Sequence, residues 1–151
     1  MRPAYAVAIP AIAYLDTTEG RRLLHQCSRD APVGVTSLWQ VTPEEVLGLD
    51  ALVAAEVGRQ LGKKVAIRSP MGPRLLHDTT RYFVQVIGIR RGELKRVYVS
   101  GVVLDAVKSF GDAPQWRSRA LIVCDGGFGF FGVEFDMARR SLVRFFFNGF
   151  A

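Results

Sequence analysis

Beyond residue 80 the sequence alternates between strand-like segments and connections that are mostly too short to hold a helix. The segments are rich in β-branched and aromatic residues and span residues 80–89, 94–104, 120–124, 128–135 and 141–150. Gly92 lies in the first connection, where a hairpin turn favours glycine. Parallel neighbours need a crossover of about a dozen residues or more, so strands joined this closely are antiparallel. The C-terminal part therefore predicts a meander sheet of about five strands.

Helical patterns come earlier in the chain. Thr42 fits an N-cap, and Pro43 fits the first helical position. Glu45 lies three residues after Thr42 and completes a capping box. Apolar residues then recur at helical spacing, at Val46, Leu49, Val53, Val57 and Leu61. Gly62 fits a C-cap. A shorter helix is predicted to begin near Asp16, whose carboxylate can accept from the first exposed amides.

Helices that precede the strands, instead of alternating with them, are typical of an α+β domain with the helices packed on an antiparallel sheet. Cystatin-like and nuclear-transport-factor-like folds share this order, an analogy that implies no function. The 151 residues suit one domain, which we expect to span residues 16–151. Residues 1–15 are predicted to be either an apolar arm or the remnant of a secretory signal. No stretch approaches the ~20 apolar residues of a membrane-spanning helix.

The stretch GGFGFFGVEF, residues 126–135, resembles the aromatic strand of an RNA-recognition motif, whose rings stack on bases. That motif has a basic residue where this chain has Gly126, an aliphatic residue where it has Phe131 and an aromatic residue where it has Val133. Here, moreover, a short turn leads to another strand and not to a helix. We therefore predict that these rings are mainly core.

Alternation along the strands predicts how the rings divide between the two faces of the sheet. It places Phe128 and Phe130 on one face of their strand, and Val143 and Phe145 on one face of the last strand. One sheet face should meet the helices. The other should be covered by the N-terminal arm, by residues 105–119 or by a partner molecule, because a wholly exposed aromatic face is unusual for a monomer.

The chain is basic, with a net charge of +6 and a pI of about 9.8. This balance is compatible with nucleic acid, anionic lipid or acidic proteins as partners. The basic doublets, however, fall at four separate connections, Arg21-Arg22, Lys63-Lys64, Arg90-Arg91 and Arg139-Arg140. Such spreading is typical of a solvated surface and disfavours a nucleic-acid site.

The two cysteines, Cys27 and Cys124, allow two interpretations. One is a disulfide between the first helix and the sheet in an exported protein, and the other is two buried thiols in a cytosolic one. A nucleophilic cysteine is disfavoured, because Asp125 beside Cys124 opposes ionisation of the thiol. His25 and Cys27 would lie on different faces of a helix, and His77 falls in a loop, so no metal site and no cofactor are predicted.

Five side chains are the candidates for contact with a ligand or partner: Tyr98, Trp116, Asp125, Phe128 and Phe130. Trp116 lies in a loop, where it could plug the core or rim a pocket. Asp125 follows a strand-like segment and fits a turn. The acids are scattered, and no pair is marked for acid–base chemistry.

Several segments together are similar to a family of small uncharacterised bacterial proteins that are often exported. They contain QCSR at 26–29, VCDGG at 123–127 and FNG at 147–149. The resemblance implies no activity. It favours export, and it favours the disulfide because both cysteines lie within the resembling segments.

The sequence thus predicts a non-catalytic binding or interaction module that buries a hydrophobic ligand or partner segment against the second sheet face. The alternative is a small-molecule pocket or enzyme lined by Asp125, Trp116 and Tyr98. A basic nucleic-acid binder is a third, less favoured interpretation. A homodimer is one way to cover the second face. An exported or periplasmic location is favoured over a cytoplasmic one.

Overall fold

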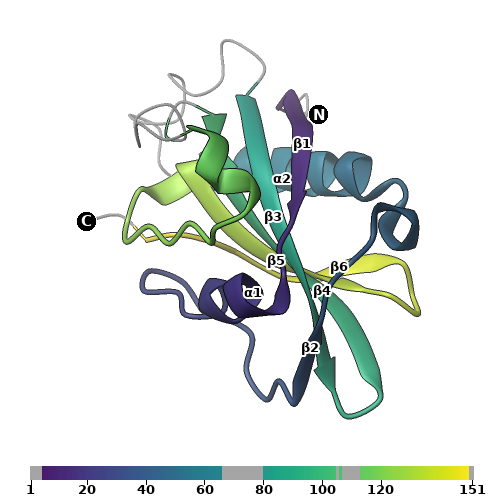
Figure 1. The fold of residues 1–151 in the computed structure, drawn as a ribbon. Helices are drawn as coiled ribbons and strands as arrows, with labels where there is room; N and C mark the ends of the chain where they lie inside the picture. Colours follow the sequence, from purple (N-terminus) through teal and green to yellow (C-terminus); the bar gives the residue numbers. More distant parts are fainter. Residues whose placement is uncertain (1–4, 66–79, 105, 107–112, 150–151) are drawn as a thin grey trace.

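A computed structural model describes residues 5–65, 80–104, 106 and 113–149. The described residues form two α-helices and a mixed, mostly antiparallel sheet of six strands (Figure 1). The strands are β1 (Val7–Tyr14), β2 (Ser37–Trp39), β3 (Thr80–Arg91), β4 (Leu94–Val103), β5 (Phe130–Asp136) and β6 (Ser141–Phe147). The helices are α1 (Thr17–Leu23) and α2 (Leu49–Val65). The predicted α+β class is confirmed, whereas a cystatin-like or nuclear-transport-factor-like fold is not confirmed.

The predicted hairpins are present. The β3–β4 pair is antiparallel from Tyr82 opposite Val103 to Arg91 opposite Leu94, and Gly92 takes the left-handed conformation in its turn, with φ of +60°. β5 and β6 form the second hairpin, and β5 also pairs with β4. The strands lie in the order β1-β3-β4-β5-β6.

Two strands come from the part of the chain before α2, which the sequence did not assign to the sheet. β1 pairs with β3 in parallel, and β2 pairs with the far end of β3 in antiparallel fashion. Both therefore lie on the same edge of β3. The predicted strand at 120–124 is absent, and this prediction was wrong. Its amides are taken by side chains instead: Ala120 N–H donates to Glu19, and Leu121 N–H donates to Gln85.

The helix starts follow the capping signals. Glu19 N–H donates to the Asp16 carboxylate at 2.8 Å, as predicted. Thr42 N–H donates to Glu45 Oε1 at 2.9 Å. The second predicted helix is nevertheless interrupted, because Gly48 adopts φ of +81° between a short 3-10 turn (Pro43–Val46) and α2. The predicted C-cap at Gly62 was also wrong, since α2 continues to Val65.

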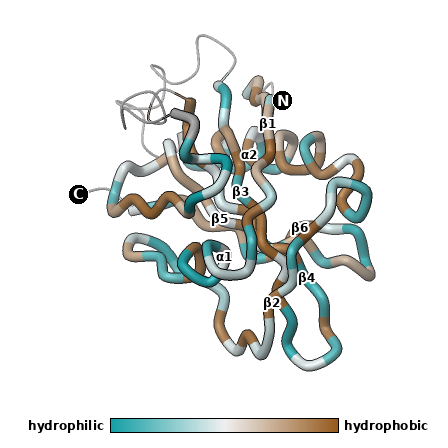
Figure 2. The backbone as a smooth tube through the Cα atoms, in the orientation of Figure 1, coloured by the Kyte–Doolittle hydropathy of each residue, from teal (hydrophilic) through white to brown (hydrophobic). Residues whose placement is uncertain are grey.

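The two helices cover opposite faces of the sheet (Figure 1), so the prediction that one face meets the helices was wrong. On one face, apolar residues of α2 pack on β3, β4 and β5 and form the main core. On the second face, α1 packs on Ile87, Ile89 and Tyr98. A further cluster there unites Val102, Phe130 and Trp116. Figure 2 shows hydrophobic residues along the central strands and hydrophilic ones around the β3–β4 turn.

The aromatic tail is a hairpin, as predicted, with rings that are buried in β5 and partly buried in β6, but two face assignments were wrong. Phe128 and Phe130 belong to clusters on opposite faces, because Gly127–Gly129 is a 3-10 turn and alternation begins only at Phe130. In β6 a bulge at Arg144, with φ of +56°, shifts the alternation. As a result Leu142, and not Val143, shares the α2 face with Phe145.

Candidate functional site

The structure does not bring the five predicted contact residues together. Tyr98 lies under α1, whereas Trp116 stacks on Phe83 in the neighbouring cluster that contains Phe130. Phe128 lies in the main core beneath α2, and Asp125 is exposed. Tyr98 and Asp125 instead flank a junction of three chain segments that sequence reasoning found only in part.

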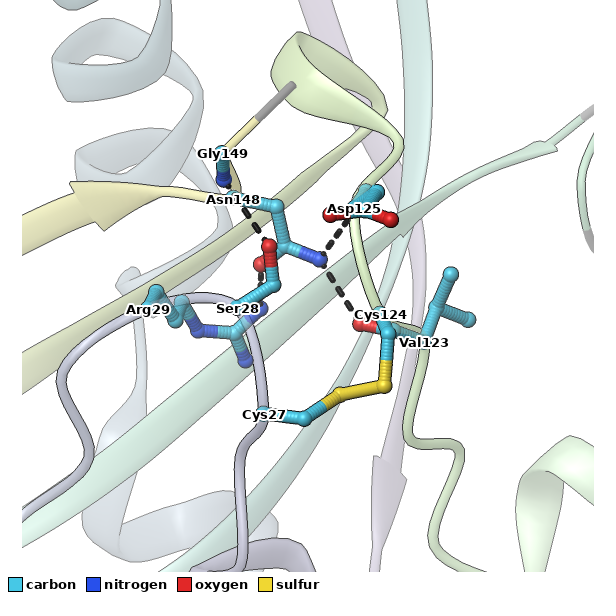
Figure 3. The surroundings of a disulfide bond; sticks show 8 residues. All are labelled: Cys27, Ser28, Arg29, Val123, Cys124, Asp125, Asn148 and Gly149. Carbon is cyan, nitrogen blue, oxygen red and sulfur yellow. Dashed lines mark hydrogen bonds between the residues drawn. A yellow bond between two sulfur atoms is a disulfide. The ribbon is translucent and has the colours of Figure 1, made fainter. Parts of the chain in front are cut away.

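The three-segment junction consists of residues 27–29, 123–127 and 148–149 (Figure 3). Its covalent link is a disulfide between Cys27 and Cys124, whose Cα atoms lie 5.4 Å apart. Both cysteines are exposed, so the bond faces solvent. It ties the loop after α1 to the segment that leads into β5.

Arg29 reaches from this junction over the second face of the sheet. Its Nε and Nη2 donate to Tyr98 Oη at 3.1 and 3.0 Å, and Nη2 also donates to Ser100 Oγ at 2.9 Å. Its Nη1 donates to Asn148 Oδ1 at 2.7 Å. Burial raises the pKa of Tyr98, although the neighbouring guanidinium opposes that rise. The phenol is therefore a neutral hydrogen-bond partner at physiological pH.

Asn148 links all three segments. Its Nδ2 donates to the carbonyl oxygens of Val123 and Asp125 at 2.9 and 2.7 Å, while its Oδ1 accepts from Arg29 (Figure 3). The next residue, Gly149, donates its N–H to Ser28 O at 2.9 Å. These bonds use both the oxygen and the nitrogen of the Asn148 side-chain amide. The side chain therefore holds the three segments of the junction together.

Glu134 forms a second polar cluster on the same sheet face. Arg91 donates to both of its oxygens, at 2.8 and 3.0 Å, and Arg96 donates to Oε1 at 3.1 Å. Arg144 Nε lies 3.4 Å from Oε2. Burial alone would raise the pKa of Glu134, but the hydrogen bonds from Arg91 and Arg96 outweigh it and lower the pKa. The carboxylate is therefore ionised and neutralised within the fold.

β6 is the exposed edge next to these clusters. It ends the strand order, and no other strand of the described residues pairs with its outer side. Phe145, Phe146 and Phe147 are only partly buried. Phe145 and Phe147 lie on the α2 face, and Phe146 lies on the second face beside Arg144. This strand thus offers apolar area on both faces.

Sequence reasoning proposed the disulfide as one of two alternatives, but it did not identify Arg29, Asn148 or Glu134. The first two lie within the QCSR and FNG segments on which the family resemblance depends. The presence of both residues in the resembling segments was the available signal for the junction. Glu134 is one of the scattered acids of the sequence, and no local pattern reveals its arginine partners.

The described residues contain no group of His, Cys, Asp and Glu side chains that could hold a metal ion. None of their helices combines the length and the hydrophobicity needed to cross a bilayer. No protein-family model, curated protein or solved structure matches the chain. The junction, the Glu134 cluster and the β6 edge are therefore the structural basis for proposing a function.

Proposed function

We propose that this protein is a non-catalytic binding module that takes an extended, apolar segment of a partner protein alongside β6. The observation that carries this proposal is the composition of the edge: three consecutive phenylalanines in the last strand of the sheet, all partly exposed.

An unpaired strand edge presents a row of backbone N–H and C=O groups that another strand can join. In this mode of recognition the main-chain hydrogen bonds supply affinity, and alternate side chains of the partner supply specificity. An added strand would extend the core on the α2 face, next to Phe145 and Phe147, and would cover Phe146 on the other face. Burial of these rings provides the apolar contribution to binding.

We also propose that the module works in an oxidising compartment, such as the bacterial periplasm. Disulfides persist there and are rare in the cytosol. The Cys27–Cys124 bond faces solvent, so a reducing cytosol would have direct access to it.

The test uses a displayed library of random nine-residue peptides, selected on the oxidised protein. The selected peptides should slow hydrogen exchange of amides in β6. Phe146→Asp should weaken their binding at least about tenfold, since it removes the ring that the added strand would cover.

Leu94→Asp is the matched control, because Leu94 is 40% exposed at the β3–β4 turn, away from the edge. It should leave binding unchanged. Slowed exchange confined to residues 113–124, or equal binding by wild type and F146D, would show that β6 is not the site.

A further inference from the structure

We infer that the segment bound at β6 carries an acidic side chain and that Arg144 is the residue that recognises its carboxylate. This inference rests on the proposed function and names the chemistry of the partner. It follows from three features of Arg144: its backbone conformation, its unused donors and its position in the strand.

The backbone of Arg144 is in a conformation that residues with a Cβ atom rarely adopt. Its φ is +56°, within an edge strand and not in a turn. This left-handed residue forms the bulge of β6, opposite the interval between Gly132 and Glu134. The bulge directs the side chain onto the second face, where the guanidinium lies 5.7 Å from the ring centre of Phe146. An arginine held beside an aromatic ring at an open edge is a pre-oriented group.

The guanidinium of Arg144 is not needed to neutralise Glu134. Arg91 and Arg96 already donate three hydrogen bonds to that carboxylate at 2.8–3.1 Å. The Nε atom of Arg144 lies 3.4 Å from Oε2 of the same carboxylate. The side chain of Arg144 is 42% exposed, against 21% for Arg91 and 18% for Arg96. Its terminal donors are therefore available for a bidentate carboxylate, the geometry that a guanidinium matches best.

The position of Arg144 argues against a second copy of the chain as the occupant. Arg144 is the middle residue of β6, which runs from Ser141 to Phe147. Two copies paired antiparallel over the full strand would place Arg144 opposite itself, and like charges in that position destabilise a pair of strands. An acidic residue of a partner segment opposite Arg144 would replace this repulsion between two arginines by an attraction.

The surrounding charge favours the same partner. Arg139 and Arg140 are exposed in the turn that leads into β6. Together with Arg144 they give this edge a positive potential, consistent with a chain of net charge +6. A partner segment with one carboxylate facing Arg144 and apolar residues facing the phenylalanines complements both properties of the edge.

The test measures affinities for three synthetic peptides by fluorescence anisotropy. Each has nine residues that alternate between valine and threonine, with one central threonine replaced by glutamate, glutamine or lysine. The wild-type protein should bind the glutamate peptide about tenfold more tightly than the glutamine peptide, as expected for one partly solvated charge-assisted bond. In Arg144→Gln this preference should fall to less than about twofold, and Arg144→Glu should prefer the lysine peptide.

Arg139→Gln is the matched control and should keep most of the glutamate preference, because Arg139 lies in the turn and not in the strand. Arg144→Gly is a second variant that tolerates the left-handed conformation, so its loss of preference cannot be ascribed to misfolding. If all three peptides bind wild type equally well, the inference is wrong while strand addition stands. If none binds, both proposals fail. A preference that survives R144Q but is lost in R139Q would assign recognition to the turn.

Discussion

Glu134 is a carboxylate with only 2% of its surface exposed, and its charge is tolerated because arginines of the β3–β4 hairpin surround it. Arg91 and Arg96 lower its pKa despite the opposing effect of burial. A carboxyl group whose pKa is lower in the folded than in the unfolded state stabilises the fold above the unfolded value. That contribution is lost as the pH falls through the folded pKa.

Glu134→Gln should therefore destabilise the protein at neutral pH and flatten its acid dependence. Removing one partner of a buried pair costs roughly 3–5 kcal/mol, and we expect about 2 kcal/mol here because the arginines reach solvent. Urea unfolding at several pH values between neutrality and the unfolded carboxyl pKa, and below it, measures both effects. The exposed Glu93→Gln is the control. An acid dependence in E134Q as steep as in wild type would contradict this account.

Gly132 is the residue that leaves room for Arg29 over the sheet. A Cβ atom at this position would lie 2.5 Å from Tyr98 Oη and 2.6 Å from Arg29 Nε. Gly132→Ala should cost roughly 1–3 kcal/mol, the usual range for overpacking a tight site. Gly62→Ala provides the contrast, because its Cβ would meet the Tyr5 ring at 3.8 Å, an ordinary contact within α2. Gly62→Ala should stabilise by up to about 1 kcal/mol, and thermal melts compare the two.

The loop after α1 and the segment before β5 lack a strand ladder of their own and are attached by side chains. Gln85 donates to the carbonyls of Trp116 and Arg119 and accepts from Leu121 N–H. The Cys27–Cys124 bond, with a separation of 97 residues, joins this segment to the loop. These attachments hold the segment over the part of the second sheet face where Trp116 packs, beside α1.

Replacing both cysteines by serine should lower stability by up to about 4–5 kcal/mol, the chain-entropy estimate for a loop of ~100 residues. Chemical reduction of wild type should give the same loss, and it should proceed in the folded state because both cysteines are exposed. Urea unfolding of oxidised, reduced and C27S/C124S protein makes the comparison. Reduction that requires denaturant would show that the bond is protected.

Local signals predicted local structure well. Asp16 and Thr42 mark helix starts that hydrogen bonds confirm, and Gly92 marks the hairpin turn. The errors in strand assignment involve partners distant in sequence. The 120–124 segment has strand composition, but Gln85 and Glu19 take its amides, so no ladder forms.

The candidate site was predictable only in its covalent part. Arg29 is a loop arginine like several others in the sequence, and nothing in its neighbourhood indicates that Tyr98, Ser100 and Asn148 will meet it. The amino-acid sequence of β6 also does not indicate that this strand lies at an edge of the sheet. This position depends on β1 occupying the other end of the sheet.

If β6 binds a partner segment as proposed, the same aromatic edge could also pair with a second copy of the chain. The charge at Arg144 disfavours the second outcome, because antiparallel pairing of two copies would place this residue opposite itself. The isolated protein is therefore expected to be a monomer despite its partly exposed phenylalanines.

Arg144→Val should convert the monomer into dimers or larger species, since it removes the central charge and since a β-branched residue disfavours the left-handed backbone that forms the bulge. Sedimentation velocity over a range of concentrations measures this change. Arg139→Val is the control in the neighbouring turn and should remain monomeric. An R144V variant that stays monomeric at the limit of its solubility would mean that the edge is protected by another feature.

The parallel pairing of β1 with β3 bears on the order in which the chain folds. During synthesis β1 leaves the ribosome before β3, so Val7 gains its neighbour in the sheet only after Thr80 has been made. The β3–β4 and β5–β6 hairpins close short loops and can form at once, whereas docking β1 closes a long one. In a refolding experiment, amides of β1 should thus acquire protection from hydrogen exchange last. By then the hairpins have formed the edge of β3 with which β1 pairs.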